Sequence, residues 1–233
     1  MADELRVTLE IGPKGKRVVA VAPDWPGLER GAKTEEAAIA RLQAYLPRYA
    51  PVATLAGMGA QFVASSASAT VDVVERYPGT GSTDFWGISF AFSDIDQQAI
   101  SSDELERELA LMQACWAFFD AVRARVSAEM QKGPRGGGRD RDRIVRHTLG
   151  AEQDFAAKLG VSAPEDALLT DDGLRAYRDT YCAAIPAFHA EGKSARNWPL
   201  RYQIRHTAFH TLDHAWEMED KDLTPTTFSA AAQ

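Results

Sequence analysis

The sequence has little cysteine and no long apolar run. Its two cysteines, Cys115 and Cys182, lie far apart within predicted helices and show no C-x-x-C spacing, so we interpret both as reduced packing residues. No stretch approaches the ~18 apolar residues of a membrane-spanning helix, which argues against a membrane protein. The first residues, MADELRVTLEIG, lack the basic start and apolar core of a secretion signal. We therefore expect a cytoplasmic protein.

An excess of positive charge is also absent. The formal net charge is −7, whereas nucleic-acid-binding domains normally carry a basic patch, so we do not expect nucleic acid as a partner. One local exception covers residues 132–146, with six Lys or Arg against two Asp. This segment is interpreted either as a solvated loop between helices or as a contact for an anion or a partner. Its GPRGGGR run lacks the lysine and serine or threonine that end a phosphate-binding P-loop.

What is present is the mixture of a globular protein, with 45% hydrophobic and 25% charged residues. Residues 5–11 and 17–22 are rich in β-branched side chains around the turn sequence GPKG, and they predict a hairpin. Residues 35–46 then have the apolar spacing of a helix. We expect Pro47 and Pro51 to end that helix.

Two further strands are predicted at residues 69–77 and 84–92, on either side of the turn-rich PGTGST. The aromatic side chains of the second segment, DFWGISFAF, would suit the surface of a homodimer if they are not part of the core. Residues 1–98 are therefore expected to form a small mixed α/β domain.

From residue 101 onward the apolar period becomes that of helices. Long helices are predicted at residues 102–130, 141–159, 171–191 and 198–220. Four long helices without an intervening strand predict a bundle over residues 99–222, followed by a tail over residues 223–233. The fold class expected for the whole chain is α+β.

Three histidines repeat every four residues in the last of these helices. Each i, i+4 step advances about 6 Å and turns about 40°, so neighbours face the same way. His206 and His214 lie too far apart along the axis for both to reach one ion through bonds of about 2.1 Å. The chelating pair is therefore His206 with His210 or His210 with His214, and His210 belongs to both.

The same strip of the helix is predicted to face inward, because it also carries Gln203 and Glu217 and is flanked by apolar residues. Buried imidazoles need partners, and a cation would supply one. Two ligands leave an ion under-coordinated, so we expect a third from another helix, with His147 as the candidate. His189 is interpreted as structural. The spacing is not that of the H-E-x-x-H zinc proteases.

These residues resemble the DinB-like superfamily of metal-binding four-helix bundles over roughly residues 101–222. The resemblance lies in H-T-L-G-A-E, which begins at His147, and in A-F-H-x-x-x-H, which carries His210 and His214. It implies that these three histidines are the metal ligands and that His206 is an alternate or neighbouring group. It also implies a transferase or isomerase that uses a low-molecular-weight thiol and acts on a small molecule.

The sequence departs from the family pattern after the last ligand, where Ala215, Trp216 and Glu217 replace the usual glycine and glutamine. Glu152 and Glu217 are candidate catalytic acids or partners of the ligands, and their other interpretation is as solvated helix-surface residues. Zinc suits three histidines, although nickel, iron and manganese accept the same ligands. The alternative function is a non-catalytic binding protein in which the metal only stabilises the fold.

The front of the chain has a second resemblance. Residues 5–50, with D-W-P-G and G-A-K-T-E-E-A at the start of the helix, are similar to the small HicB-like β-β-α module. Some relatives of that module bind DNA or toxin partners. Here the resemblance implies a structural, dimerising or partner-recognising role in preference to nucleic-acid binding.

Overall fold

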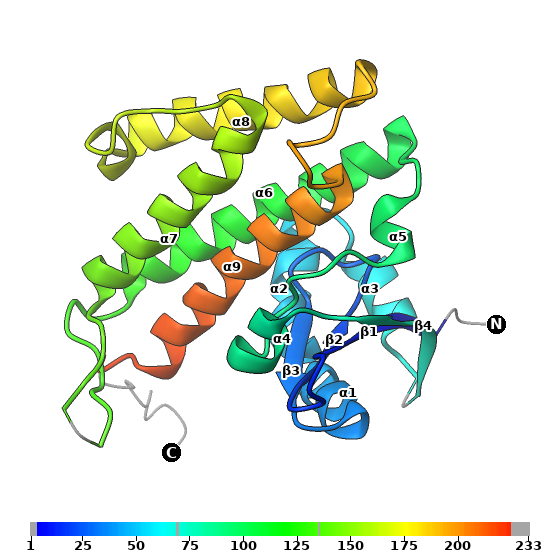
Figure 1. Ribbon diagram of the computed structural model, residues 1–233. Helices are drawn as coiled ribbons and strands as arrows, with labels where there is room; N and C mark the ends of the chain where they lie inside the picture. Colours follow the sequence, from blue (N-terminus) through cyan, green and yellow to red (C-terminus); the bar gives the residue numbers. More distant parts are fainter. Residues whose placement is uncertain (1–3, 69, 135, 225–233) are drawn as a thin grey trace.

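The computed structural model describes residues 4–68, 70–134 and 136–224, and it has an α+β fold in which helices dominate (Figure 1). The four strands form one mixed sheet in the order β3-β2-β1-β4. Their bounds are Leu5–Ile11 for β1, Val18–Val21 for β2, Glu29–Ala32 for β3 and Val71–Pro78 for β4. β1 pairs antiparallel with β2 and parallel with β4.

The hairpin predicted at residues 5–22 is confirmed, as is a strand within residues 69–77, of which residue 69 lies outside the described part. β3 escaped prediction because its sequence, ERGA, has no β-branched residue. The prediction of a strand over residues 84–92 is wrong. The segment begins within helix α4, Gly81–Trp86. This helix starts at a capping box between Thr80 and Thr83, and it ends at Gly87, which has the left-handed conformation.

Contacts with the β1–β2 turn help to explain why this segment is helical. The Asp84 carboxylate accepts hydrogen bonds from the backbone N–H groups of Lys14, Lys16 and Arg17 at 2.7 to 3.2 Å. Phe85 and Trp86 then lie on the surface, 73% and 66% exposed. A homodimer formed through these side chains stays a prediction.

The expectation that Pro47 and Pro51 end a helix is also wrong. Helix α1, Glu35–Ala44, stops before both, and α2, Leu46–Leu55, contains them. Pro47 occupies the first turn of α2, where its missing N–H costs no hydrogen bond. Pro51 lies inside α2, and a short α3, Gly59–Ser65, follows.

The four predicted long helices are present, and the first ends earlier than expected because Val126 has an extended backbone. They are α6 (Ser102–Arg125), α7 (Arg141–Ala156), α8 (Asp171–Ala190) and α9 (Leu200–Asp220). Shorter elements are α5 (Asp94–Gln97) and the 3-10 turns η1 (Ala157–Leu159) and η2 (Ala167–Leu169). No described helix is long and apolar enough to cross a membrane. Their assignment to a DinB-like bundle stays a prediction.

Helix α9 is the central element, with α6 running alongside it, α7 on one side and the sheet on the other (Figure 1). Most of its side chains are buried, on every face of the helix. The residues before α6 share one hydrophobic core with the helices, through side chains such as Trp25 and Leu28. Gly27 permits this close approach, because a Cβ there would lie 2.8 Å from a methyl group of Leu212. The expected division near residue 98 stays a prediction, and the expected tail lies almost wholly outside the described residues.

Candidate metal centre

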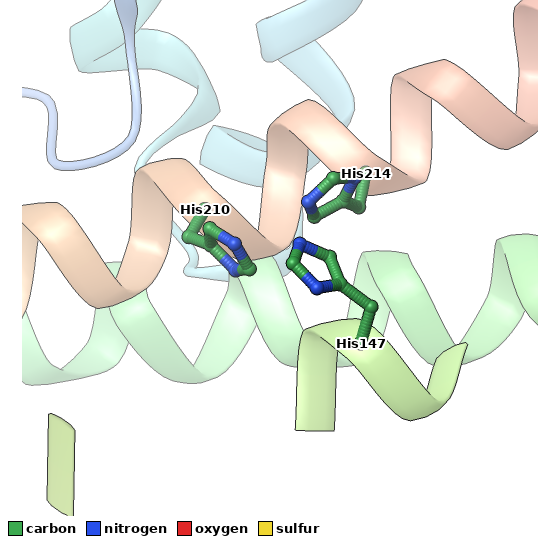
Figure 2. A group of neighbouring side chains, drawn as sticks. All are labelled: His147, His210 and His214. Carbon is green, nitrogen blue, oxygen red and sulfur yellow. The ribbon is translucent and has the colours of Figure 1, made fainter. Parts of the chain in front are cut away.

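Three histidines, one on α7 and two on α9, lie close together at a place where the α7 residue, His147, is exposed. His210 and His214 project from successive turns of α9, and His147 reaches them from α7 (Figure 2). The ring centroids are 4.5 Å apart for His210 and His214, 4.8 Å for His147 and His214, and 5.3 Å for His147 and His210. One nitrogen from each ring lies within 4.8 Å of the others.

This separation suits a single ion. Two nitrogens bound to zinc at about 2.1 Å lie no more than about 4.2 Å apart, so a small rotation of the rings would bring the three donors into range. The i, i+4 spacing on α9 supplies two donors without distorting the helix. Of the two pairs that the sequence left open, the structure brings His210 and His214 together with His147.

Glu217 orients one of these ligands. Its Oε2 accepts a hydrogen bond from Nδ1 of His214 at 2.7 Å, which leaves Nε2 of that ring as the donor for an ion. The carboxylate is also held by Arg139 at 2.8 Å and by Lys221 at 2.6 Å. Burial would raise the pKa of Glu217, but hydrogen bonds from His214 and Lys221 and the charge of Arg139 lower it to about 2. Glu217 is therefore an ionised hydrogen-bond partner of His214, and its role beside a bound metal stays a prediction.

Replacing Glu217 with glutamine should lower metal affinity about tenfold, because the carboxylate that aligns His214 and makes it more basic is lost. Competition titration with a chromophoric chelator measures the change. Glu219→Gln is the matched control, since Glu219 lies on the same helix but pairs with Arg48 and Arg125. Equal affinities in the two variants would contradict the assigned role of Glu217.

The ligand histidines are suited to hold an ion near neutral pH. Burial, followed by the nearby His214 and His206, lowers the pKa of His210 to about 2. Burial also lowers the pKa of His147, with His214 and Arg139 adding to the effect. Because a lowered pKa keeps imidazole neutral, these rings need not lose a proton to bind metal.

Zinc binding at pH 6 should therefore release few protons. Three histidines with the ordinary pKa near 6.5 would release about two protons, whereas we expect fewer because His210 is already neutral at this pH. At this pH a zinc-bound water, with a pKa near 7, contributes little. The number follows from the dependence of the calorimetric binding enthalpy on the ionisation enthalpy of the buffer. A release of two or more protons would contradict the neutral state of His210.

His206 lies one turn away from the three ligands and is not part of their group. Its ring stacks on Tyr202 with centroids 5.1 Å apart, and Phe155 and Trp198 pack against it. Burial, with a smaller contribution from Arg205, lowers its pKa to about 3. Its Nδ1 is buried, and no residue in the described part of the chain forms a hydrogen bond with it. His206 therefore forms part of an aromatic cluster that adjoins His210 through Phe155.

Glu152 is not solvated, and its role as a catalytic acid stays a prediction. It is buried, and its two carboxylate oxygens accept hydrogen bonds from Nε and Nη2 of Arg178 at 3.0 Å each. The interpretation of Glu152 as a surface residue is thus wrong, because α8 covers this face of α7. His189 is structural as expected, with Nε2 2.7 Å from the carbonyl oxygen of Ile100.

Two residues of the site were missed by the sequence reasoning. Lys221 stands four residues after Glu217, so helical spacing could have found it. Arg139 belongs to the basic segment over residues 132–146, but no spacing rule connects it to Glu217. The second half of that segment is the start of α7, and Lys132 pairs with Asp140 before it.

The chain matches no family model, no curated protein and no solved structure. The DinB-like and HicB-like resemblances therefore stay predictions. What supports the metal centre is its geometry and the chemistry of its three nitrogen donors.

Proposed function

We propose that the protein binds one divalent metal ion on His147, His210 and His214 and acts as a metal-dependent enzyme of the thiol-transferase or isomerase type on a small molecule. The observation that carries this proposal is the convergence of three imidazoles from α7 and α9. His147 is exposed, so solvent and small molecules can approach that side of the group. Three protein ligands with an accessible further position are the arrangement of catalytic zinc sites.

The residues around the histidines favour an open site. A closed structural zinc site needs a fourth protein ligand. The carboxylate of Glu217 contacts one of the three histidines, His214. Its oxygens, however, already accept hydrogen bonds from His214, Arg139 and Lys221. A position left to water or a thiol therefore fits the surroundings better than a fourth side chain.

The chemistry follows from this arrangement. A divalent ion held here would lower the pKa of a bound water or thiol and so provide a nucleophile near neutral pH. Glu217 holds the His214 ring in one tautomer and orientation, and burial keeps His210 neutral. The phenyl ring of Phe155, 5.7 Å from His210 between centroids, borders the group on the side of His206. An apolar part of a substrate would meet this ring.

Zinc is the proposed ion, and nickel, iron and manganese are alternatives because they accept the same donors. The proposed cosubstrate is a low-molecular-weight thiol, with a cytoplasmic location and without nucleic acid as a partner. The alternative function is a binding protein in which the ion only joins α7 to α9. One observation favours it: two of the three donors lie on the central helix, so an ion would fix α7 against the core.

Cobalt substitution separates the two functions. If the site is catalytic, added thiol should displace solvent from the ion and produce an intense sulfur-to-cobalt charge-transfer band. His189→Ala protein, which keeps the three ligands, should respond as the wild type does. A cobalt spectrum that no thiol changes would contradict the enzyme proposal and favour a structural ion.

A further inference from the structure

A second feature of the molecule lies at the side of α9 that faces the sheet. Arg30, on β3, is buried, with 5% of the residue exposed. Its Nε and Nη2 atoms are buried and have no hydrogen-bond partner among the residues that the structure describes. A buried guanidinium with unpaired N–H groups is costly, because each donor has lost its water without replacement. The buried charge therefore favours an anion beside the guanidinium, at the atom that the cavity leaves within reach.

The surroundings hold the guanidinium in place. Its central carbon lies 3.7 Å from the ring centroid of Tyr45 and 4.3 Å from that of Trp216, so the two aromatic rings stabilise the cation. Nη1 donates to the carbonyl oxygen of Glu29 at 3.0 Å and to Asp213 Oδ1 at 3.2 Å. Nη1 is therefore the atom through which Arg30 binds a carboxylate oxygen.

A small cavity adjoins this side chain. Its volume is about 140 Å³, and residues of β3, the end of α4 and α9 line it. Arg30, Arg41, Trp86 and Asp213 are among the residues that line it. Arg41 is exposed and uses Nη1 to bind the carbonyl oxygen of Gly31 at 3.0 Å. Two arginines thus border a space about large enough for a group the size of benzene or phosphate.

Two acidic residues also border the cavity, and neither prevents an anion from entering. The two carboxylate oxygens of Glu29 accept hydrogen bonds from Arg205 and from the backbone N–H of Ser89, so they are not directed at Arg30. The Asp213 side chain is 48% exposed, so it can move into solvent. The contact between Asp213 and Arg30 shows that the guanidinium can bind a carboxylate oxygen at this position.

We propose that this cavity binds a small oxyanion, either a carboxylate or a phosphate group, which takes the place of Asp213 on Arg30 and is also contacted by Arg41. The planar fork of arginine fits both groups. The volume admits the anionic group of a ligand and excludes a large ligand as a whole. The site is separate from the three histidines and does not depend on the proposed metal chemistry.

The test is a calorimetric titration of the full-length protein with inorganic phosphate and, separately, with acetate. Bound metal is first removed by a chelator, because it would bind phosphate itself, and sodium chloride at the same ionic strength serves as the reference. We expect saturable binding of at least one of the two anions. The anion that binds more tightly identifies which group the cavity accepts.

Two variants place the binding in this cavity, and both change exposed or half-exposed side chains. Arg41→Gln should weaken binding of the anion by at least about tenfold, because one charge-assisted hydrogen bond is lost. Asp213→Asn should strengthen it, because the competing carboxylate is removed. Arg76→Gln, an exposed arginine that pairs with Glu35, should leave it unchanged. The absence of saturable binding, or binding that neither Arg41→Gln nor Asp213→Asn alters, would overturn the proposal.

Discussion

Replacing His210 with alanine should weaken zinc binding by at least about a hundredfold, because one of three ligands contributes several kcal/mol to the binding free energy. His210 shares α9 with His214 and faces His147 across the helix interface, so its loss leaves two donors on different helices (Figure 2). Thiol-transfer activity, if the proposed function is right, should disappear with the metal. Competition titration and metal analysis after gel filtration measure the binding.

The controls separate loss of a ligand from loss of the fold. His147→Ala should have a similar effect on metal binding, and since His147 is exposed its removal leaves no cavity. His189→Ala should bind zinc as the wild type does, because His189 contacts Ile100 and lies outside the group. Wild-type affinity in both the His210 and the His147 variants would exclude these residues as ligands.

Replacing Arg205 with methionine should lower the free energy of unfolding by about 3–5 kcal/mol, because it leaves buried carboxylates without their counterion. Arg205 donates from Nε and Nη2 to the two oxygens of Asp96 at 2.7 Å each. Its Nη1 reaches Glu29 at 3.3 Å and Ser89 Oγ at 3.1 Å. One side chain of α9 thus joins β3 to the segment between α4 and α6.

Urea denaturation measures this change, with Arg6→Met as the control. Arg6 pairs with Asp24 at 3.0 Å, but both side chains are more than 40% exposed. Arg6→Met should therefore lower the free energy of unfolding by less than about 1 kcal/mol. If Arg205→Met lowers stability no more than Arg6→Met does, the buried network does not hold the sheet region to α9.

Much of the helical half of the chain could be predicted, because helices and their capping depend on residues close in sequence. The i, i+4 repeat of His206, His210 and His214 is local information, and it identified two donors. The choice between the two pairs came from the resemblance to DinB-like proteins. Only the fold shows that His147 meets His210 and His214, and that His206 lies among aromatic rings instead.

What escaped prediction depends on contacts between distant residues. The burial of Glu152 was missed because its partner, Arg178, lies on another helix 26 positions away. The strand predicted at residues 84–92 failed for a similar reason. Its β-type composition was overridden by the helix cap at Thr80 and by the hydrogen bonds that Asp84 accepts from the β1–β2 turn. The cap is a local pattern that the sequence does carry, whereas the contacts of Asp84 with a turn about 70 positions away do not appear in any window of the sequence.

An anomalous difference map at the zinc absorption edge, from crystals of zinc-loaded protein, tests the metal centre most directly. We expect one strong peak within about 2.1 Å of a nitrogen from each of His147, His210 and His214. On His214 that nitrogen should be Nε2, with Nδ1 still hydrogen-bonded to Glu217. A map without a peak among these three rings, at full zinc saturation of the protein, would contradict the account.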